Sequence, residues 1–266
     1  NAEWFIDRTH GQEYFHRWHA FLKKSGGLFV HKATHHFDLL NWYLDDEPYS
    51  VYASGKRNVF GDAGKIRGER CSKCPHSDSC WAVLKSTLQD ADLNPGSDGE
   101  IFNELYFKAE HVDGYFRDGC CFNPEIDIYD TMNAIIKYKS GTVVNYCLTA
   151  YSPTAGYDIT FTGENGRIEI GSLDQHTRAP NSKEQDYIRV YHGTTRENIT
   201  LEEYFFDKID APHGGGDRAM FDLLLGAGGD DPLGLCAGSD AGARSALIGI
   251  TANESIKSGK VELVNL

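Results

Sequence analysis

Apolar side chains near the start of the chain recur at the spacing of a helix. The stripe between residues 11 and 24 is made of Tyr14, Phe15, Trp18, Phe21 and Leu22. Residues three and four apart share one face of a helix, and the glycine pair that follows is typical of a helix end. Arg17 and His19 lie off this stripe and are expected at the surface. A second apolar run predicts another helix over residues 30–44.

Later segments alternate between apolar and polar residues, as strands with one buried face do. The predicted strands cover residues 49–57, 129–138, 142–151, 156–163, 166–171, 187–192 and 261–264. Further helices are predicted near 101–108, 217–226 and 240–258. Short turns such as Glu164-Asn165-Gly166 join consecutive strands as hairpins, which indicates antiparallel pairing. The pattern therefore predicts an α+β fold: an open, mainly antiparallel β-sheet with helices on one face, plus a cysteine-rich insertion.

Length and charge narrow the class of protein. The 266 residues are expected to form a single domain, 1–266, with residues 68–122 as a cysteine-rich lobe. Apolar runs fall short of the roughly 20 residues that cross a bilayer, so no membrane partner is expected. A formal net charge of −13 opposes binding to a phosphate backbone, so nucleic acid is not an expected partner.

Residues 31–38 concentrate groups that handle protons. Three histidines, a lysine and an aspartate occupy this stretch: His31, Lys32, His35, His36 and Asp38. On one helix, His31, His35 and Asp38 would share a face, and two imidazoles one turn apart can move protons near neutral pH. A polar helix start with solvated histidines explains the same pattern. The spacing leaves both interpretations open.

The cysteines form the second chemical feature. Cys71, Cys74 and Cys80 follow a C-x2-C-x5-C spacing, and a Cys120-Cys121 pair stands downstream. Tetrahedral zinc needs four ligands, so Cys71, Cys74, Cys80 and Cys120 are the predicted set for a closed structural site. His76 is a substitute for either of the last two. Disulfides or free thiols remain alternatives, because seven cysteines leave an odd one.

Several of these motifs resemble one family of enzymes. The segment from Gly26-Gly27 through His35 and Asp38 resembles the start of the C-terminal domain of Gfo/Idh/MocA-type oxidoreductases. Residues 67–75, 118–122, 213–217 and 240–258 resemble later parts of the same domain, in the same order. His35 matches the family histidine that handles the substrate hydroxyl. His31 stands where many members have aspartate, which is a departure from the family pattern.

The resemblance implies an NAD(P)-dependent oxidoreductase that acts on a sugar, cyclitol or related polyol. His35 would be the acid/base and His31 would orient or relay. Lys32, His213 and Asp217 would contact the small-molecule substrate. Among the paired cysteines, Cys120 matches the family pattern better than Cys121. The resemblance also implies a homo-oligomer, joined through the sheet face that the helices leave open.

A dinucleotide-binding segment is missing from the sequence. No G-x-G-x-x-G motif follows a predicted strand, and the family's Glu-Lys-Pro does not occur. NAD(P) is therefore expected to bind mainly an N-terminal Rossmann domain outside this chain, and the chain alone is expected to be inactive. A cytoplasmic location is favoured. An NAD-dependent glycosidase and a non-catalytic, zinc-stapled interaction domain remain alternative functions.

Overall fold

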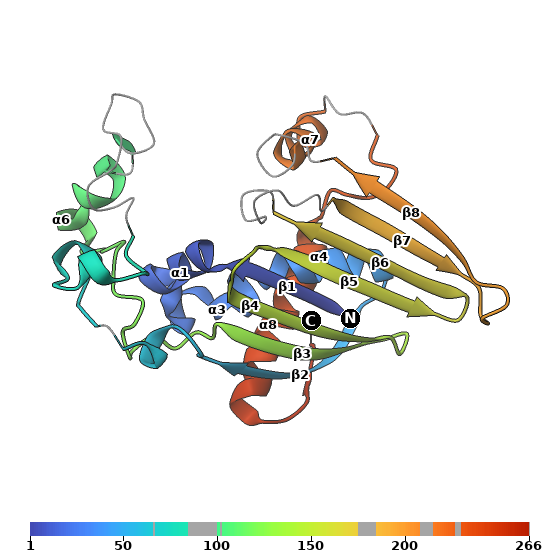
Figure 1. Cartoon of the computed structure of the whole chain (residues 1–266), viewed down its shortest axis with the longest axis horizontal. Helices are drawn as coiled ribbons and strands as arrows, with labels where there is room; N and C mark the ends of the chain where they lie inside the picture. Colours follow the sequence, from blue (N-terminus) through green and yellow to red (C-terminus); the bar gives the residue numbers. More distant parts are fainter. Residues whose placement is uncertain are drawn as a thin grey trace.

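The computed structural model describes residues 1–65, 67–84, 100–101, 103–174, 185–207, 215–226 and 230–265. Within them the chain forms one nine-stranded sheet, with the long helices gathered on one side of it (Figure 1). The strands are β1 (Ala2–Asp7), β2 (Pro48–Lys56), β3 (Thr131–Tyr138), β4 (Val143–Ser152), β5 (Gly156–Gly163), β6 (Gly166–Leu173), β7 (Asp186–His192), β8 (Thr200–Phe206) and β9 (Glu262–Leu263). Their order is β8-β7-β6-β5-β1-β4-β3-β2-β9.

Seven α-helices are assigned in the described part of the chain. They are α1 (Arg8–His16), α2 (Leu22–Ser25), α3 (Gly27–His31), α4 (Ala33–Leu44), α6 (Glu110–Asp113), α7 (Gly216–Leu224) and α8 (Ser239–Ser258). None of the described helices combines the length and the hydropathy needed to cross a membrane. The predicted fold class, an open α+β sheet with helices, is confirmed.

One strand gives the sheet its only parallel pair among the described strands. β1 lies between β4 and β5, with Ala2 opposite Tyr146 on one side and Ile159 on the other. It runs parallel to β4, whereas every other pair of neighbouring strands in the described part of the sheet is antiparallel. The sequence pattern predicted neither β1 nor β8.

The predicted helix over residues 11–24 is interrupted. α1 begins at Arg8 because the Asp7 carboxylate accepts hydrogen bonds from the backbone N–H groups of Thr9 and His10, at 2.9 and 3.1 Å. After α1 the backbone of Arg17 is extended, and a 3₁₀ turn covers Trp18–Ala20. The prediction of one long helix was therefore wrong, and the bend turns His19 inward.

Burial alternates along the strands that the helices cover. On β3, Met132, Ala134, Ile136 and Tyr138 are buried and the residues between them are exposed. These side chains join Phe29 of α3, Phe37 and Leu40 of α4, and Ile248 of α8 in one core. Gly249 lets α8 approach α3 closely, because a Cβ atom there would lie 2.2 Å from the Phe29 carbonyl oxygen.

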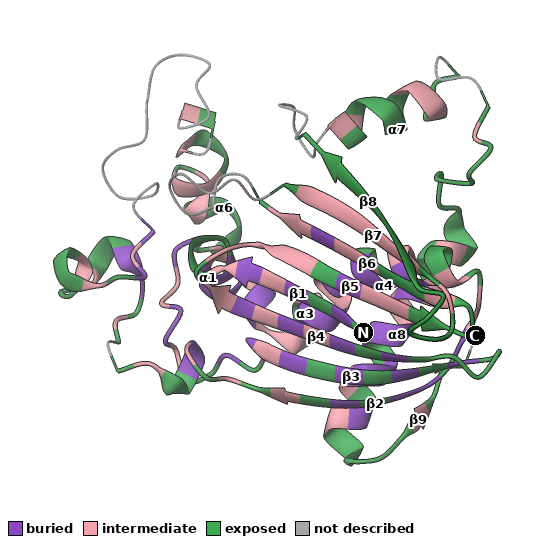
Figure 2. Cartoon of the chain, turned by 45° about the vertical axis from the view of Figure 1, so that its right-hand side comes forward, coloured by how far each residue is buried: buried purple, intermediate pink, exposed green. Residues whose placement is uncertain are grey.

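Burial fades toward the other edge of the sheet (Figure 2). Every residue of β8 is exposed, including the apolar Leu201, Phe205 and Phe206. α7 stands on the β8 side of the molecule in both views and has no buried residue (Figures 1 and 2). The sheet therefore has a covered half (β2, β3, β4 and β1) and an open half (β6, β7 and β8).

The described part of the cysteine-rich segment stands beside α1, beyond the end of the sheet (Figure 1). A buried ion pair holds it together: Arg70 Nε donates to Asp118 Oδ1 at 2.8 Å, and the same guanidinium pairs with Glu110. The Asp118 side chain is fully buried and also accepts from the Ser72 N–H at 2.8 Å. His16 of α1 contacts the carbonyl oxygens of Gly119 and Ala82, at 2.5 and 2.8 Å, which ties the lobe to the domain.

Candidate functional site

The predicted helix over residues 30–44 is two helices that meet at Lys32. α3 ends at His31 and α4 begins at Ala33, while Lys32 takes φ −107° and ψ −50°. Lys32 is half-buried, and burial lowers the pKa of its ammonium group. The junction therefore places a partly desolvated lysine between two histidines of the motif, at the start of α4.

His31 lies in an aromatic cluster rather than on the open face of α4. Its ring centroid is 4.1 Å from that of His19, with the planes at 76°. It is 5.6 and 5.8 Å from the centroids of Tyr14 and Trp18, in edge-on arrangements. His19 also stacks on Trp18 at 3.9 Å. The Nδ1 atoms of His19 and His31 are both buried without a hydrogen-bond partner among the described residues. The two imidazole rings are therefore in contact, and the Nδ1 atom of each forms no hydrogen bond within the described residues.

Burial keeps both imidazoles neutral at physiological pH. It lowers the pKa of His19 to about 3, with smaller contributions from His31 and nearby arginines. Burial also lowers the pKa of His31, followed by the positive charges of Arg17 and Lys32. A neutral imidazole offers one donor and one acceptor, so each can hold a substrate oxygen or pass a proton.

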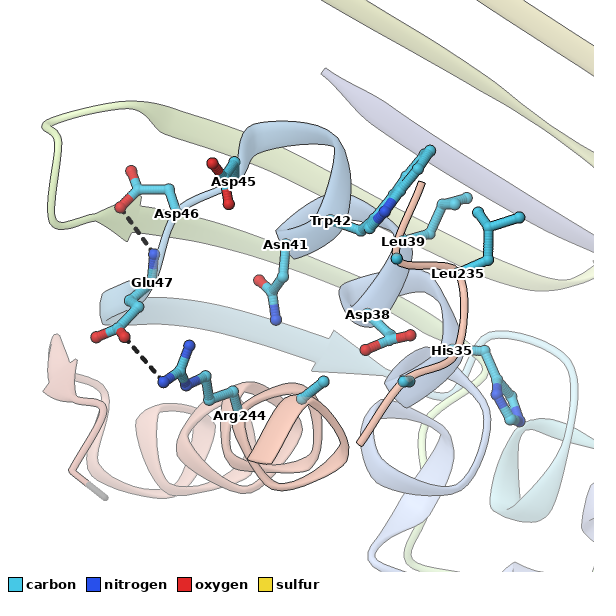
Figure 3. Close-up of a pocket in the computed structure, with 13 residues that line it drawn as sticks. His35, Asp38, Leu39, Asn41, Trp42, Asp45, Asp46, Glu47, Leu235 and Arg244 are labelled. Carbon is cyan, nitrogen blue, oxygen red and sulfur yellow. Dashed lines mark hydrogen bonds and ion pairs between the residues drawn. The ribbon is translucent and has the colours of Figure 1, made fainter. Parts of the chain in front are cut away.

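His35 is exposed and stands at one end of a cavity of about 510 Å³, opposite Asp46 and Glu47 (Figure 3). Trp42 and Asp38 also line it. Asp38 accepts a hydrogen bond from Ser245 Oγ at 3.1 Å and so joins α4 to α8. His35 is close enough to His31 to lower the pKa of that imidazole. The structure therefore brings the two predicted catalytic histidines into one neighbourhood, with His35 on the open side.

His36 belongs to the core. Its ring stacks on Trp4 at 4.3 Å with an interplanar angle of 6°, and its Nδ1 is 2.8 Å from the Tyr146 hydroxyl. Burial lowers the pKa of His36 to about 3. It therefore links α4 to β1 and β4 as a neutral side chain, away from the exposed His35.

His19 was expected at the surface, and this expectation was wrong. The residue is 4% exposed, and it makes the closest ring contact that His31 has. The cause is the break after α1, because the extended Arg17 redirects the chain before Trp18. Arg17 itself is partly buried, with its Nε atom enclosed and without a partner among the described residues.

The remaining predicted substrate contacts are His213 and Asp217. His213 falls outside the described residues. Asp217 is in the first turn of α7, on the β8 side of the molecule. Its predicted contact with substrate stays a prediction.

The structure gives the predicted zinc site no support. Cys71, Cys74, Cys80 and Cys120 do line one small pocket together with His16. However, the described residues contain no group of three or more histidine, cysteine, aspartate or glutamate side chains that could hold a metal ion. Burial raises the pKa of the Cys71 thiol to about 11, so this side chain is a protonated thiol in the metal-free chain.

The structure also bears on the disulfide alternative and on the substitute ligand His76. All seven cysteines are free, so the disulfide alternative is not observed. His76, the substitute ligand, is exposed and is not among the residues that line the cysteine pocket. The contacts that visibly hold the lobe are those of Arg70, Asp118 and His16 described above.

The comparison with known families agrees with this architecture. Residues 2–263 match the profile described as "Oxidoreductase family, C-terminal alpha/beta domain", that of Gfo/Idh/MocA. This match places the chain in the class of oxidoreductase domains. The chain belongs to the Gfo/Idh/MocA oxidoreductase family and corresponds to its C-terminal domain.

Among curated relatives, the Bacillus subtilis (strain 168) protein named "Putative oxidoreductase YteT" is 34% identical over 266 residues, covering 94% of this chain and 58% of that protein. An oxidoreductase domain protein from Kribbella flavida is a similar solved structure, with a TM-score of 0.57 and 12% identity over 100% of this chain and 57% of that chain. Levoglucosan dehydrogenase, in complex with NADH and levoglucosan, has a TM-score of 0.52 and 14% identity over 100% and 58%. At these identities the two structures show the fold alone, and the chain spans little more than half the length of each relative.

Proposed function

We propose that this chain is the substrate-binding half of an NAD(P)-dependent oxidoreductase that acts on a hydroxyl group of a sugar, cyclitol or related polyol. The observation that carries the proposal is the junction of α3 and α4, where Lys32 and two histidines meet at one site of a Gfo/Idh/MocA domain. Two proteins with solved structures of this fold support the substrate class: levoglucosan dehydrogenase and an aldose-aldose oxidoreductase from Caulobacter crescentus.

NAD(P) would be the hydride acceptor, held mainly by an N-terminal Rossmann domain of the whole protein. The sequence offers no glycine-rich turn between a strand and a helix that would cradle a dinucleotide. We therefore assign this chain the substrate side of the reaction only.

The residues of this chain would accept and transfer the proton of the substrate hydroxyl. A hydroxyl whose carbon loses hydride must also lose its O–H proton, and a carbonyl forms. His35 would take that proton, because it is the exposed imidazole beside the cavity. His31, shielded and neutral, would orient the substrate or relay the proton, and the Lys32 ammonium would hold a substrate oxygen.

A second copy of this chain would cover the outer face of the sheet, the face turned away from α4 and α8. Ile135 of β3 and Phe205 of β8 are both exposed, at 48% and 52%. Large exposed apolar patches on a sheet are typical of subunit interfaces. The homo-oligomer is part of the proposal.

The test of the catalytic proposal is a pair of matched histidine substitutions in the full-length protein. His35→Ala should lower kcat by about 10²–10⁴-fold, the usual contribution of a general base. His192→Ala, at an exposed histidine of β7, should leave turnover unchanged. If both variants turn over alike, His35 is not the base. Hydrolysis of a glycoside without net change in NAD(P) would instead identify the glycosidase chemistry.

A further inference from the structure

The cavity beside His35 extends well beyond that residue. It follows α4 from His35 to Asp45, and α8 and the loop residues Gly234 and Leu235 line its other side (Figure 3). A helix rises about 1.5 Å per residue, so this stretch is about 14 Å long. A six-membered sugar ring with its hydroxyl groups spans roughly 6 Å, because its bonds are about 1.5 Å long. One ring held at His35 would therefore leave more than half of this length unused.

The side chains at the far end of the cavity are held in place by the fold. Glu47 pairs with Arg244 of α8 at 2.9 Å and with Lys139 at 2.5 Å. Asp46 accepts hydrogen bonds from the backbone N–H groups of Glu47 and Ser140, at 2.7 and 3.2 Å. Polar groups that are fixed before a ligand arrives lose little entropy when they bind it. This end of the cavity therefore has the properties of a preformed polar site.

One polar atom at this end has no partner among the described residues. Arg244 Nε is buried and forms no hydrogen bond within them, while Nη2 of the same guanidinium group holds Glu47. Buried donors in native proteins are nearly always paired, so this Nε atom indicates an acceptor that is not among the described residues. Arg244 itself lines the cavity, so a ligand in the cavity can supply that acceptor. The oxygen of a sugar hydroxyl group is an acceptor of this kind.

The middle of the cavity offers groups for both the apolar and the polar parts of a sugar. Trp42 is 41% exposed, and its indole N–H donates to the Leu233 carbonyl oxygen at 2.9 Å, which fixes the ring. The Asn41 amide is fixed as well, because its Oδ1 accepts from the Tyr138 hydroxyl at 2.8 Å. An indole ring packs against the C–H groups of a sugar, while the Asn41 amide and the Asp38 carboxylate can bond its hydroxyl groups.

We propose that this cavity binds a second sugar unit, the outer sugar, linked to the sugar that is oxidised at His35. The substrate is then a disaccharide or a longer glycoside rather than a free monosaccharide or cyclitol. The outer sugar lies against Trp42 and reaches Arg244. The cavity volume, about 510 Å³, falls within the usual range of ligand sites. The inference rests on the proposed function, since it starts from a substrate hydroxyl at His35.

The test compares disaccharides with the monosaccharides that they contain. Calorimetry on the full-length protein would use cellobiose, maltose and trehalose against glucose, and lactose and melibiose against galactose. At least one disaccharide should bind about tenfold or more tightly than its monosaccharide, because a second ring makes contacts of its own. The methyl glycosides of glucose and galactose carry no second ring and should bind like the free sugars.

Substitutions at the far end separate the outer sugar from the one at His35. Arg244→Gln should weaken the preferred disaccharide by about 10–100-fold, the range for a charge-assisted hydrogen bond, and leave the monosaccharide unchanged. Arg244→Lys keeps the positive charge but has no Nε atom, so it should recover only part of the loss. Arg57→Gln is the matched control, because Arg57 pairs with Asp62 at the same 2.9 Å but does not line the cavity.

Equal affinity for every disaccharide and its monosaccharide, or no binding by any disaccharide, would overturn the inference. So would methyl glycosides that bind as tightly as the disaccharides, or an Arg244→Gln protein that loses affinity for both sugars alike. NAD(P) reduction is measured separately. If a disaccharide binds more tightly but is never oxidised, the proposed function fails and the outer sugar site stands. If free sugars are oxidised and no disaccharide binds more tightly, the outer sugar site fails and the proposed function stands.

Discussion

The covered and open halves of the sheet both carry large apolar side chains, but these side chains are buried only in the covered half. On β3 of the covered half, every second residue is buried against helices, down to 0% exposure for Ile136 and Tyr138. On β8 of the open half, Leu201, Phe205 and Phe206 are also apolar, yet every side chain is exposed. The difference lies in what packs on the strands, because α3, α4 and α8 share a core with β3 but not with β8.

Apolar residues therefore have different roles in the two halves of the sheet. Apolar residues of the covered half stabilise the single chain, since they leave water when it folds. Those of the open half gain little from the folding of the single chain and need another surface. The presence of apolar residues in the sequence does not by itself show which of the two cases applies. The helices decide which strands become core, and the same helices carry the histidines of the site.

The largest effect on the free energy of unfolding should come from removing a buried side chain from the covered half. Phe37 is fully buried and Phe205 is 52% exposed, so the two phenylalanines form a matched pair. Phe37→Ala should lower the free energy of unfolding by about 3–5 kcal/mol, the usual cost of a large core cavity. Phe205→Ala should change it by no more than about 0.5 kcal/mol. Urea denaturation at low protein concentration measures both, and similar losses would remove the distinction between the halves.

A second prediction is that low pH destabilises the covered half, because His36 becomes protonated when the chain unfolds. The folded pKa of His36 is about 3, well below the ordinary value of 6.5. The unfolded chain therefore binds a proton that the folded chain excludes between these values. This imidazole should cost about 1.4 kcal/mol of stability for each pH unit below 6.5, until about pH 3, and its effect should be absent above 6.5.

The control for this prediction uses a non-titrating side chain. His36→Gln keeps a hydrogen-bonding group near Tyr146 and should flatten the fall of stability with decreasing pH. His192→Gln, on the exposed end of β7, should leave the slope unchanged. Thermal denaturation from pH 7.5 to 4.5 gives the slopes. A His36→Gln protein with the slope of the parent would show that acid lability arises elsewhere.

The smallest effect on stability is expected at the outer face of the open half. Phe205→Asp should leave the unfolding of one protomer almost unchanged, because the side chain is already exposed. It should nevertheless weaken self-association, since a buried charge at an apolar interface is costly. Sedimentation velocity measures the state, with Val112→Asp on the exposed α6 as control. If Phe205→Asp and the parent associate alike, the proposed second copy does not use this face.

Local sequence signals predicted the bounds of several strands closely. The strands predicted at 142–151 and 156–163 correspond to Val143–Ser152 and Gly156–Gly163, because turn residues and alternation act within a few positions. β1 was missed because its partners are remote in sequence, and its six residues carry no turn signal of their own. β8 was missed although its segment is rich in aromatic residues.

The site was harder to predict, because it depends on how separate segments meet. Periodicity placed His31, His35 and Asp38 on one helix face, but the break at Lys32 turns His31 toward His19. The Arg17-Trp18-His19 run was the available signal, since two polar groups beside an aromatic ring in a helical stripe are unusual at a surface.

The position of β1 has a consequence for how the chain folds. β4 and β5 are consecutive in sequence but not neighbours in the sheet, since β1 separates them. The β3–β4 hairpin and the β5–β8 meander can each form from local contacts, on fast timescales. Joining them requires the first residues of the chain to pair with strands more than a hundred positions later, at a large cost in loop entropy. Insertion of β1 is therefore the expected slow step of folding. Until it is complete, the β3–β4 hairpin and the β5–β8 meander should exchange their amide hydrogens as separate units.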